Sequence, residues 1–168
     1  MMPLRIPNRE IQDVFRQEIW DFFNQHLDNV FLDDLKNSLW AGETEKATET
    51  MNLILQSTLS FYHEFHEYSY HLILAGLFTG MGYKVLSEME TGYGCSDLIV
   101  PDPAELRCMI LELKHVKERS ELLDAVGEAG SQINRKKYES RMRYEGYKIR
   151  MKYAMAFCGK ECLIRLDD

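Results

Sequence analysis

Long hydrophobic runs, a leader-like opening and an excess of positive charge are all missing from this sequence. The longest clean apolar run, residues 72–78, is far too short to cross a bilayer. Residues 1–5 lack the apolar stretch of a signal peptide, so we expect a cytoplasmic protein. The 27 acidic and 20 basic side chains give a formal net charge of -7. This charge at first argues against a nucleic-acid partner, because phosphate contacts need Lys and Arg.

Cysteine is scarce, and the sites built on closely spaced metal ligands are missing. None of the four cysteines forms a CxxC pair, which argues against a zinc ribbon. Ordinary buried or half-buried thiols are the better account of Cys158 and Cys162. His63 and His66 lack the HExxH spacing of a zinc metalloprotease, and we interpret both as exposed histidines at the start of a helix.

Two apolar segments carry charged residues where a buried strand normally has none. Asp97 stands at the start of the first segment, and Glu112 and Lys114 lie on the second. Side chains two apart on a strand point to the same face, so Glu112 and Lys114 face one way while the neighbouring leucines face a core. Because unpaired buried charge is costly, the pattern predicts a site for a divalent cation such as Mg2+, with an ammonium group to orient the attacking water. A surface ion pair on an edge strand is the alternative for Glu112 and Lys114.

Apolar periodicity predicts an α/β chain. Helices are expected at residues 8–23, 30–40, 43–59, 65–82 and 120–143, the last with Ser120 as its N-cap. Strands are expected at residues 83–88, 97–100, 107–115, 149–157 and 162–166, with a hairpin turn at Gly159 and Lys160 between the last two. Pro101 and Pro103 are expected to end the second strand. The order predicts an α/β/α sandwich with a mixed central sheet over residues 61–168, preceded by an all-helical N-terminal extension over residues 1–60.

Charge is unevenly distributed along the chain. Residues 1–60 hold ten acidic and five basic residues, whereas residues 131–152 hold eight basic and two acidic ones. Local fields rather than the total charge steer a polyanion. A basic cluster with an interleaved tyrosine would suit a nucleic-acid backbone: Arg135, Lys136, Lys137, Tyr138 and Arg141. The dipole of a helix also favours basic residues at its C-terminal end, which is the structural alternative.

Together these segments resemble a known family. Asp97, a spacer and Glu112-Leu113-Lys114 in an apolar strand are similar to the signature of the PD-(D/E)XK nuclease superfamily, which has the restriction-endonuclease-like fold. Further matching segments are Glu67 to His71, the lead-in from Glu90 to Gly94, and Gln132-Ile133 with Tyr138. They resemble a bacterial subfamily in which such a domain follows an AAA-like ATPase domain in a longer chain.

The resemblance implies a metal-dependent nuclease that hydrolyses phosphodiester bonds in DNA, with RNA the less favoured substrate. Mg2+ would be the cofactor, and Mn2+ could replace it. The resemblance implies that Asp97, Glu112 and the backbone carbonyl of Leu113 bind the metal and that Lys114 positions or activates the attacking water. An AAA-like ATPase domain or chain is the implied partner.

Three further residues have both a functional and a structural interpretation. Glu67 is either a first-turn acid favoured by the helix dipole or the extra catalytic acid that the resemblance implies. His71, one turn later, either supports Glu67 or a phosphate or is a core histidine. Gln132 either positions water or phosphate or is a polar residue at the boundary of its helix.

The competing hypothesis is a nuclease-like fold that is catalytically weak or inactive and binds nucleic acid or an ATPase partner. The acidic net charge and the lack of a P-loop in this chain agree with it. Cys95 also stands where the resembling subfamily more usually has Arg. Intact Asp97, Glu112 and Lys114 favour an active enzyme, since a scaffold has no evident need for all three.

Overall fold

The computed structural model describes residues 28–59, 65–88, 97–133 and 142–167, together with residues 14, 17, 18, 21 and 25. The strands are β1 (Leu86–Glu88), β2 (Asp97–Asp102), β3 (Arg107–His115), β4 (Lys148–Cys158) and β5 (Glu161–Asp167). The helices are α2 (Asn29–Ala41), α3 (Thr44–Thr58), α4 (Glu67–Gly80) and α5 (Leu122–Ile133), with a short 3₁₀ turn at Arg119–Glu121. The predicted helix over residues 8–23 is helical at its described positions, and the rest of it lies outside the described residues.

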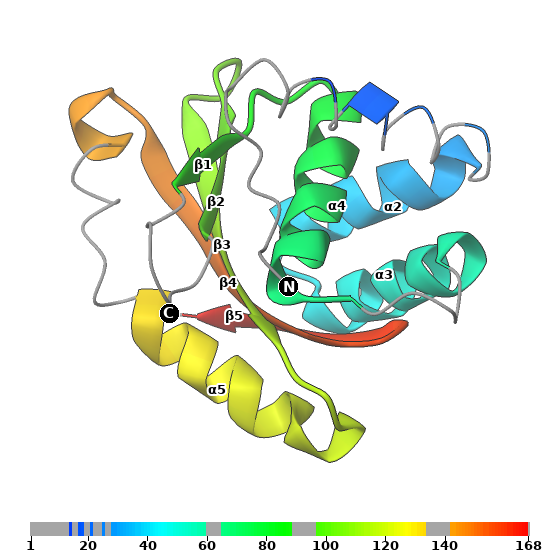
Figure 1. Cartoon of the computed structure of the whole chain (residues 1–168). Helices are drawn as coiled ribbons and strands as arrows, with labels where there is room; N and C mark the ends of the chain where they lie inside the picture. The colour runs from blue at the N-terminus through cyan, green and yellow to red at the C-terminus, as the bar shows by residue number, and fades with distance from the viewer. Residues whose placement is uncertain are drawn as a thin grey trace.

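The five strands form one sheet in the order β1-β2-β3-β4-β5. β3 is the central strand, antiparallel to β2 and parallel to β4. Adjacent parallel strands need a crossover connection, and α5 lies in the one between β3 and β4. α2, α3 and α4 cover one face of the sheet and α5 covers the other (Figure 1). The predicted α/β/α sandwich with a mixed sheet is therefore confirmed.

The side chains of β3 divide between two cores. Leu111 and Leu113 belong to the large cluster under α2, α3 and α4. Ile110 belongs to the opposite cluster with Ile133 of α5. Glu112 follows Ile110 by two residues, so it shares the α5 face, and it has no exposed surface. Glu112 thus lies on a central, covered strand, which excludes the alternative of a surface ion pair on an edge.

The helical extension predicted for residues 1–60 packs directly against the sheet. Its helix α3 lies along the edge strand β5, whose outer backbone groups would otherwise lack strand partners. The N–H of Cys162 donates to Oδ1 of Asn52 at 2.7 Å, and the N–H of Ile164 donates to Oγ1 of Thr48 at 3.1 Å. Side chains of α3 therefore protect the open edge of the sheet.

The start of α5 differs from the prediction. Ser120 is not an N-cap, because it lies inside the 3₁₀ turn, and α5 begins at Leu122. The turn is instead closed locally, by the N–H of Glu118 donating to the carboxylate of Glu121 at 3.1 Å. Residues 134–141 of the predicted helix lie outside the described residues, and residues 142–144 are helical.

β2 also extends further than predicted. Pro101 pairs with Cys108 and the ladder to β3 continues to Asp102. The physical reason is that β1 pairs with β2 only between Asp97 and Ile99, which leaves an edge from residue 100 onward, and an edge tolerates a proline. The predicted β4–β5 hairpin is confirmed, with Gly159 in its turn at a φ of 56° that suits glycine. None of the helices in the described part of the chain has the length and apolar character needed to cross a membrane.

Candidate active site

The register of the sheet brings two of the predicted metal ligands together. Asp97, the first residue of β2, is the pairing partner of Glu112 on β3. Directly opposite residues in an antiparallel pair have Cα atoms about 4.5–5.5 Å apart. Asp97 and Glu112 are thus neighbours across two strands, as a shared metal site requires. The glycine-rich lead-in and Cys95 lie outside the described residues.

The backbone of β3 shows where the carbonyl of Leu113 points. The N–H of Val116 donates to a carbonyl of β4 at 2.9 Å. Backbone groups of successive residues in a strand point alternately to its two sides, so those of Leu113 and His115 point away from β4, toward β2. Because β2 begins at Asp97, no described residue of β2 lies opposite Leu113. The Leu113 carbonyl therefore points to the same edge of β3 at which Asp97 is found.

Glu67 reaches this edge from the opposite layer. Its Oε2 accepts a hydrogen bond from the backbone N–H of His115 at 3.3 Å. Glu67 is the first residue of α4, half-buried, where the helix dipole favours a negative charge. A merely solvated first-turn acid would not need this contact with β3. The structure thus brings Glu67 to the end of the strand that carries Glu112 and Lys114.

Lys114 is half-buried and follows Glu112 by two residues on the same strand, so both point to the α5 face. Their pairing partners on β4 are Ala154 and Ala156. These two alanines pack against α5. The small alanine side chains leave room on this covered face for the two long charged side chains of Glu112 and Lys114.

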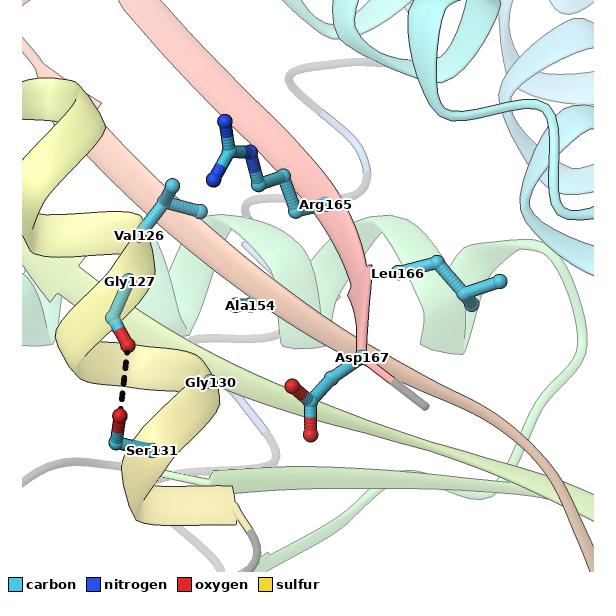
Figure 2. Close-up of a pocket in the computed structure, with 8 residues that line it drawn as sticks. All are labelled: Val126, Gly127, Gly130, Ser131, Ala154, Arg165, Leu166 and Asp167. Carbon is cyan, nitrogen blue, oxygen red and sulfur yellow. Dashed lines mark hydrogen bonds between the residues drawn. The ribbon is translucent and has the colours of Figure 1, made fainter.

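Gln132 is half-buried near the end of α5. A helix turns about 100° per residue, so Gln132 lies on the flank opposite Gly127 and Gly130. These glycines line a cavity of about 270 Å³ between α5, β4 and β5, with Arg165 and Asp167 projecting from β5 (Figure 2). Gln132 is therefore on the flank toward β3, and the cavity is not part of the candidate active site. Glycine at position 130 suits this spot, because a Cβ there would lie 3.0 Å from Oδ1 of Asp167.

The remaining candidates either lie in the core or fall outside the described residues. His71 is buried in α4 and stacks on Tyr68, with 6.2 Å between ring centroids. This is a core position, and a role in supporting Glu67 stays a prediction. Cys158 is a half-buried free thiol and Cys162 is a buried one. Burial raises the pKa of both thiols. The basic cluster lies wholly outside the described residues: Arg135, Lys136, Lys137, Tyr138 and Arg141.

The chemistry of the predicted ligands fits a hard cation. Asp97, Glu112 and the Leu113 carbonyl offer only oxygen, which is the ligand type that Mg2+ prefers over sulfur or imidazole. A carboxylate as buried as Glu112 stays charged only beside cations or hydrogen-bond donors. Within the described residues no three His, Cys, Asp or Glu side chains cluster as a metal site. Two carboxylates completed by a backbone carbonyl are therefore the set to consider.

Residues 65–166, from the start of α4 to β5, match the model of a known family, the PD-(D/E)XK nuclease superfamily. The chain belongs to this superfamily. PD-(D/E)XK nucleases generally use divalent metals, in agreement with the oxygen ligands described above. No individual curated protein matches the chain. The superfamily match begins after α3, so α2 and α3 lie outside it although they share its core.

His115 is the residue that sequence analysis missed. Its backbone N–H holds Glu67, and its ring stacks on Tyr70 with centroids 5.7 Å apart. The signal present in the sequence is a polar ring directly after Lys114, at the point where the apolar strand ends. Nothing in the local pattern indicates that α4 would meet this residue, because the contact joins positions far apart in the chain.

Proposed function

We propose that this chain is a Mg2+-dependent nuclease that hydrolyses phosphodiester bonds in DNA. The observation that carries the proposal is the meeting of three elements at one edge of β3. Asp97 of β2 is paired with Glu112, and Glu67 of α4 binds the backbone two residues beyond Leu113. Three elements that each carry an acidic residue therefore meet at the edge of β3 at which the proposal places a hard cation and a phosphate.

In this proposal Asp97, Glu112 and the Leu113 carbonyl hold the metal, and Mn2+ can take the place of Mg2+. When bound, a divalent metal polarises the scissile phosphate and lowers the pKa of water. Lys114 extends from the same face as Glu112 and donates hydrogen bonds, so it orients the attacking water and stabilises the negative charge that develops on the phosphate oxygens.

The other roles support these. Glu67 orients the attacking water from the β2 side of β3, and His71 supports Glu67 from the next turn of α4. Gln132 positions water or phosphate from α5. The residues proposed to contact the DNA backbone are Arg135, Lys136, Lys137, Tyr138 and Arg141. An AAA-like ATPase domain or chain is proposed as partner on the resemblance to the bacterial subfamily alone.

Cleavage of labelled single- and double-stranded DNA and RNA tests the proposal, in Mg2+, in Mn2+ and in EDTA. We expect cleavage of DNA that needs metal and falls at least about a hundredfold in Lys114→Ala, the usual scale for loss of a proton-handling group. Lys148→Ala is the matched control, because Lys148 is exposed at the far end of β4. Its activity should equal that of the wild type.

Calorimetric titration with Mg2+ gives a second readout that does not depend on cleavage. A folded wild type that neither cleaves any substrate nor binds metal would contradict the nuclease proposal. It would favour the competing hypothesis of an inactive module that binds nucleic acid or an ATPase partner. Metal binding without cleavage of DNA, but with cleavage of RNA, would correct the substrate.

A further inference from the structure

A second cavity opens beside Glu67, at the end of β3 and the start of α4. It has a volume of about 360 Å³, within the range of small-molecule sites. Four of its described lining residues carry rings, and the described lining is Phe65, His66, Tyr70, His115, Val116, Lys117 and Gly159. No role in the proposed hydrolysis has been given to any of these side chains.

The rings of this cavity are held in place by the fold. Tyr70 stacks on Phe157 of β4, with centroids 4.5 Å apart and an interplanar angle of 18°. Its hydroxyl donates to the carbonyl of Gly159 at 2.7 Å. His115 in turn stacks on Tyr70 at 5.7 Å, and His66 meets His115 edge-on at 6.3 Å. Tyr70 has no exposed surface, so it orders the wall from behind. The aromatic wall that can meet a ligand consists of the rings of Phe65, His66 and His115.

The charge of the cavity suits a ligand that joins a flat ring to a phosphate. Lys117 is exposed at its rim, and none of the described residues that line it is acidic. Lys117 therefore supplies a positive charge beside the rings of the cavity. The cavity beside α5 and β5 differs in this respect, because Asp167 lines it.

The cavity also borders the candidate active site. His115 directly follows Lys114, and its backbone N–H is the group that binds Glu67. His66 directly precedes Glu67. Glu112 and His115 are three positions apart on the strand, which is about 10 Å at 3.3 Å per residue. The His115 side chain points to the α4 face of the sheet, as Leu113 does, whereas Glu112 and Lys114 point to the α5 face. A nucleic-acid strand with a phosphate at Glu112 and Lys114 would therefore pass around the end of β3 to place a nearby base at the aromatic wall.

We propose that this cavity binds an unpaired base of the DNA strand whose phosphate is to be cleaved, so that the substrate is single-stranded or has a frayed end. The inference rests on the proposed nuclease function and adds the state of the substrate. Aromatic side chains and histidine rings stack on unpaired bases regardless of sequence. Bases inside a duplex are stacked and paired, and a base can enter a pocket only after it is unpaired and extruded, which is energetically costly. The site therefore selects strands that are already open.

Fluorescence anisotropy with a labelled single strand and with a blunt duplex of the same sequence tests this, in EDTA so that no strand is cut. The wild type should bind the single strand more tightly than the duplex. His115→Ala should weaken single-strand binding about tenfold, the scale of one lost stacking contact, and leave duplex binding unchanged. His115→Phe keeps a flat ring and should retain the wild-type affinity.

Lys117→Ala supplies an independent arm at an exposed position. Each phosphate contact on a single strand contributes about 0.7 to the slope of log K against log salt. The slope should decrease by about this amount in Lys117→Ala and stay unchanged in the control Lys84→Ala, at an exposed position before β1. A thermal unfolding curve of each variant shows whether it is folded. If His115→Ala is not folded, the salt slope of Lys117→Ala decides.

Cleavage of the same strands in Mg2+ separates this inference from the nuclease proposal. Metal-dependent cleavage with unchanged single-strand affinity in His115→Ala and an unchanged salt slope in Lys117→Ala would overturn the base site and leave the nuclease standing. Absence of cleavage together with ring-dependent binding of the single strand would overturn the nuclease proposal and leave the base site standing. Equal affinity of the wild type for the single strand and the duplex, or no binding of either, would also overturn the base site.

Discussion

Glu112 has no exposed surface, yet it lies on the central strand with Asp97 as its neighbour on β2. If these carboxylates hold a divalent ion, Mg2+ should stabilise the folded state by mass action, by about 2.7 kcal/mol at a concentration one hundred times its Kd. For a chain of this size that corresponds to a rise in Tm of about 5–10 °C. The Glu112→Gln variant keeps the side-chain volume and should lose this rise.

Differential scanning fluorimetry with and without Mg2+ measures the effect. Glu105→Gln is the matched control, since Glu105 is exposed in the turn between β2 and β3, and its Tm should rise with Mg2+ as in the wild type. An equal Mg2+-induced rise in Glu112→Gln would show that the ion binds elsewhere.

His115 should make stability sensitive to mild acid. Burial lowers its pKa in the folded state from the ordinary 6.5, so below about pH 6.5 the unfolded chain takes up a proton that the folded chain resists. The free energy of unfolding therefore falls as pH drops below this value. In His115→Phe this part of the fall should be missing. Urea unfolding at pH 7.0, 6.0 and 5.0 provides the comparison, and parallel pH profiles for the two proteins would contradict the assignment.

At the scale of elements, α3 and β5 depend on one another. Asn52 accepts from the N–H of Cys162 and donates to its carbonyl, at 2.7 and 3.4 Å. Asn52→Ala would leave an edge N–H without its partner at a part-buried site, which costs about 1–3 kcal/mol. Urea unfolding should show this loss. Asn37→Ala on the exposed side of α2 is the control, and alanine there should be neutral or slightly stabilising. Equal effects of the two substitutions would mean that α3 does not protect the edge.

Elements defined by their own periodicity are the ones that sequence analysis predicted best. The bounds of β3 agree with the structure residue for residue, because an apolar run in a covered strand carries its own signal. The start of α5 was missed, since a 3₁₀ turn with its own Glu118–Glu121 contact precedes the helix. The register of Asp97 and Glu112 follows from the hairpin-like pairing of consecutive strands. The Glu67–His115 contact cannot be predicted in this way, because it joins a helix and a strand that are far apart in the sequence.

The helices α2 and α3 raise a question about the whole molecule. They lie outside the segment that matches the PD-(D/E)XK nuclease superfamily, residues 65–166. Sequence analysis separates them as an extension over residues 1–60. Yet they share one hydrophobic core with α4 and the sheet, and several of their side chains have no exposed surface in it: Leu35, Leu39, Met51, Ile54 and Leu55. Among the described residues, α2 and α3 thus complete with α4 the cover over one face of the superfamily region.

A chain containing only residues 61–168 should fail to fold cooperatively. Burying one Leu, Ile or Met side chain contributes about 1.5–3 kcal/mol, so losing five of them removes as much as a typical domain's entire stability of about 5–15 kcal/mol. Circular dichroism on heating should show no cooperative transition for this fragment. Within the full chain, Leu55→Ser should destabilise strongly, whereas Leu53→Ser, at a position 48% exposed on the same helix, should not. A cooperative transition in the fragment whose Tm rises with Mg2+ would contradict this prediction. It would show that residues 61–168 fold without α2 and α3, because metal binding requires the assembled edge of β3.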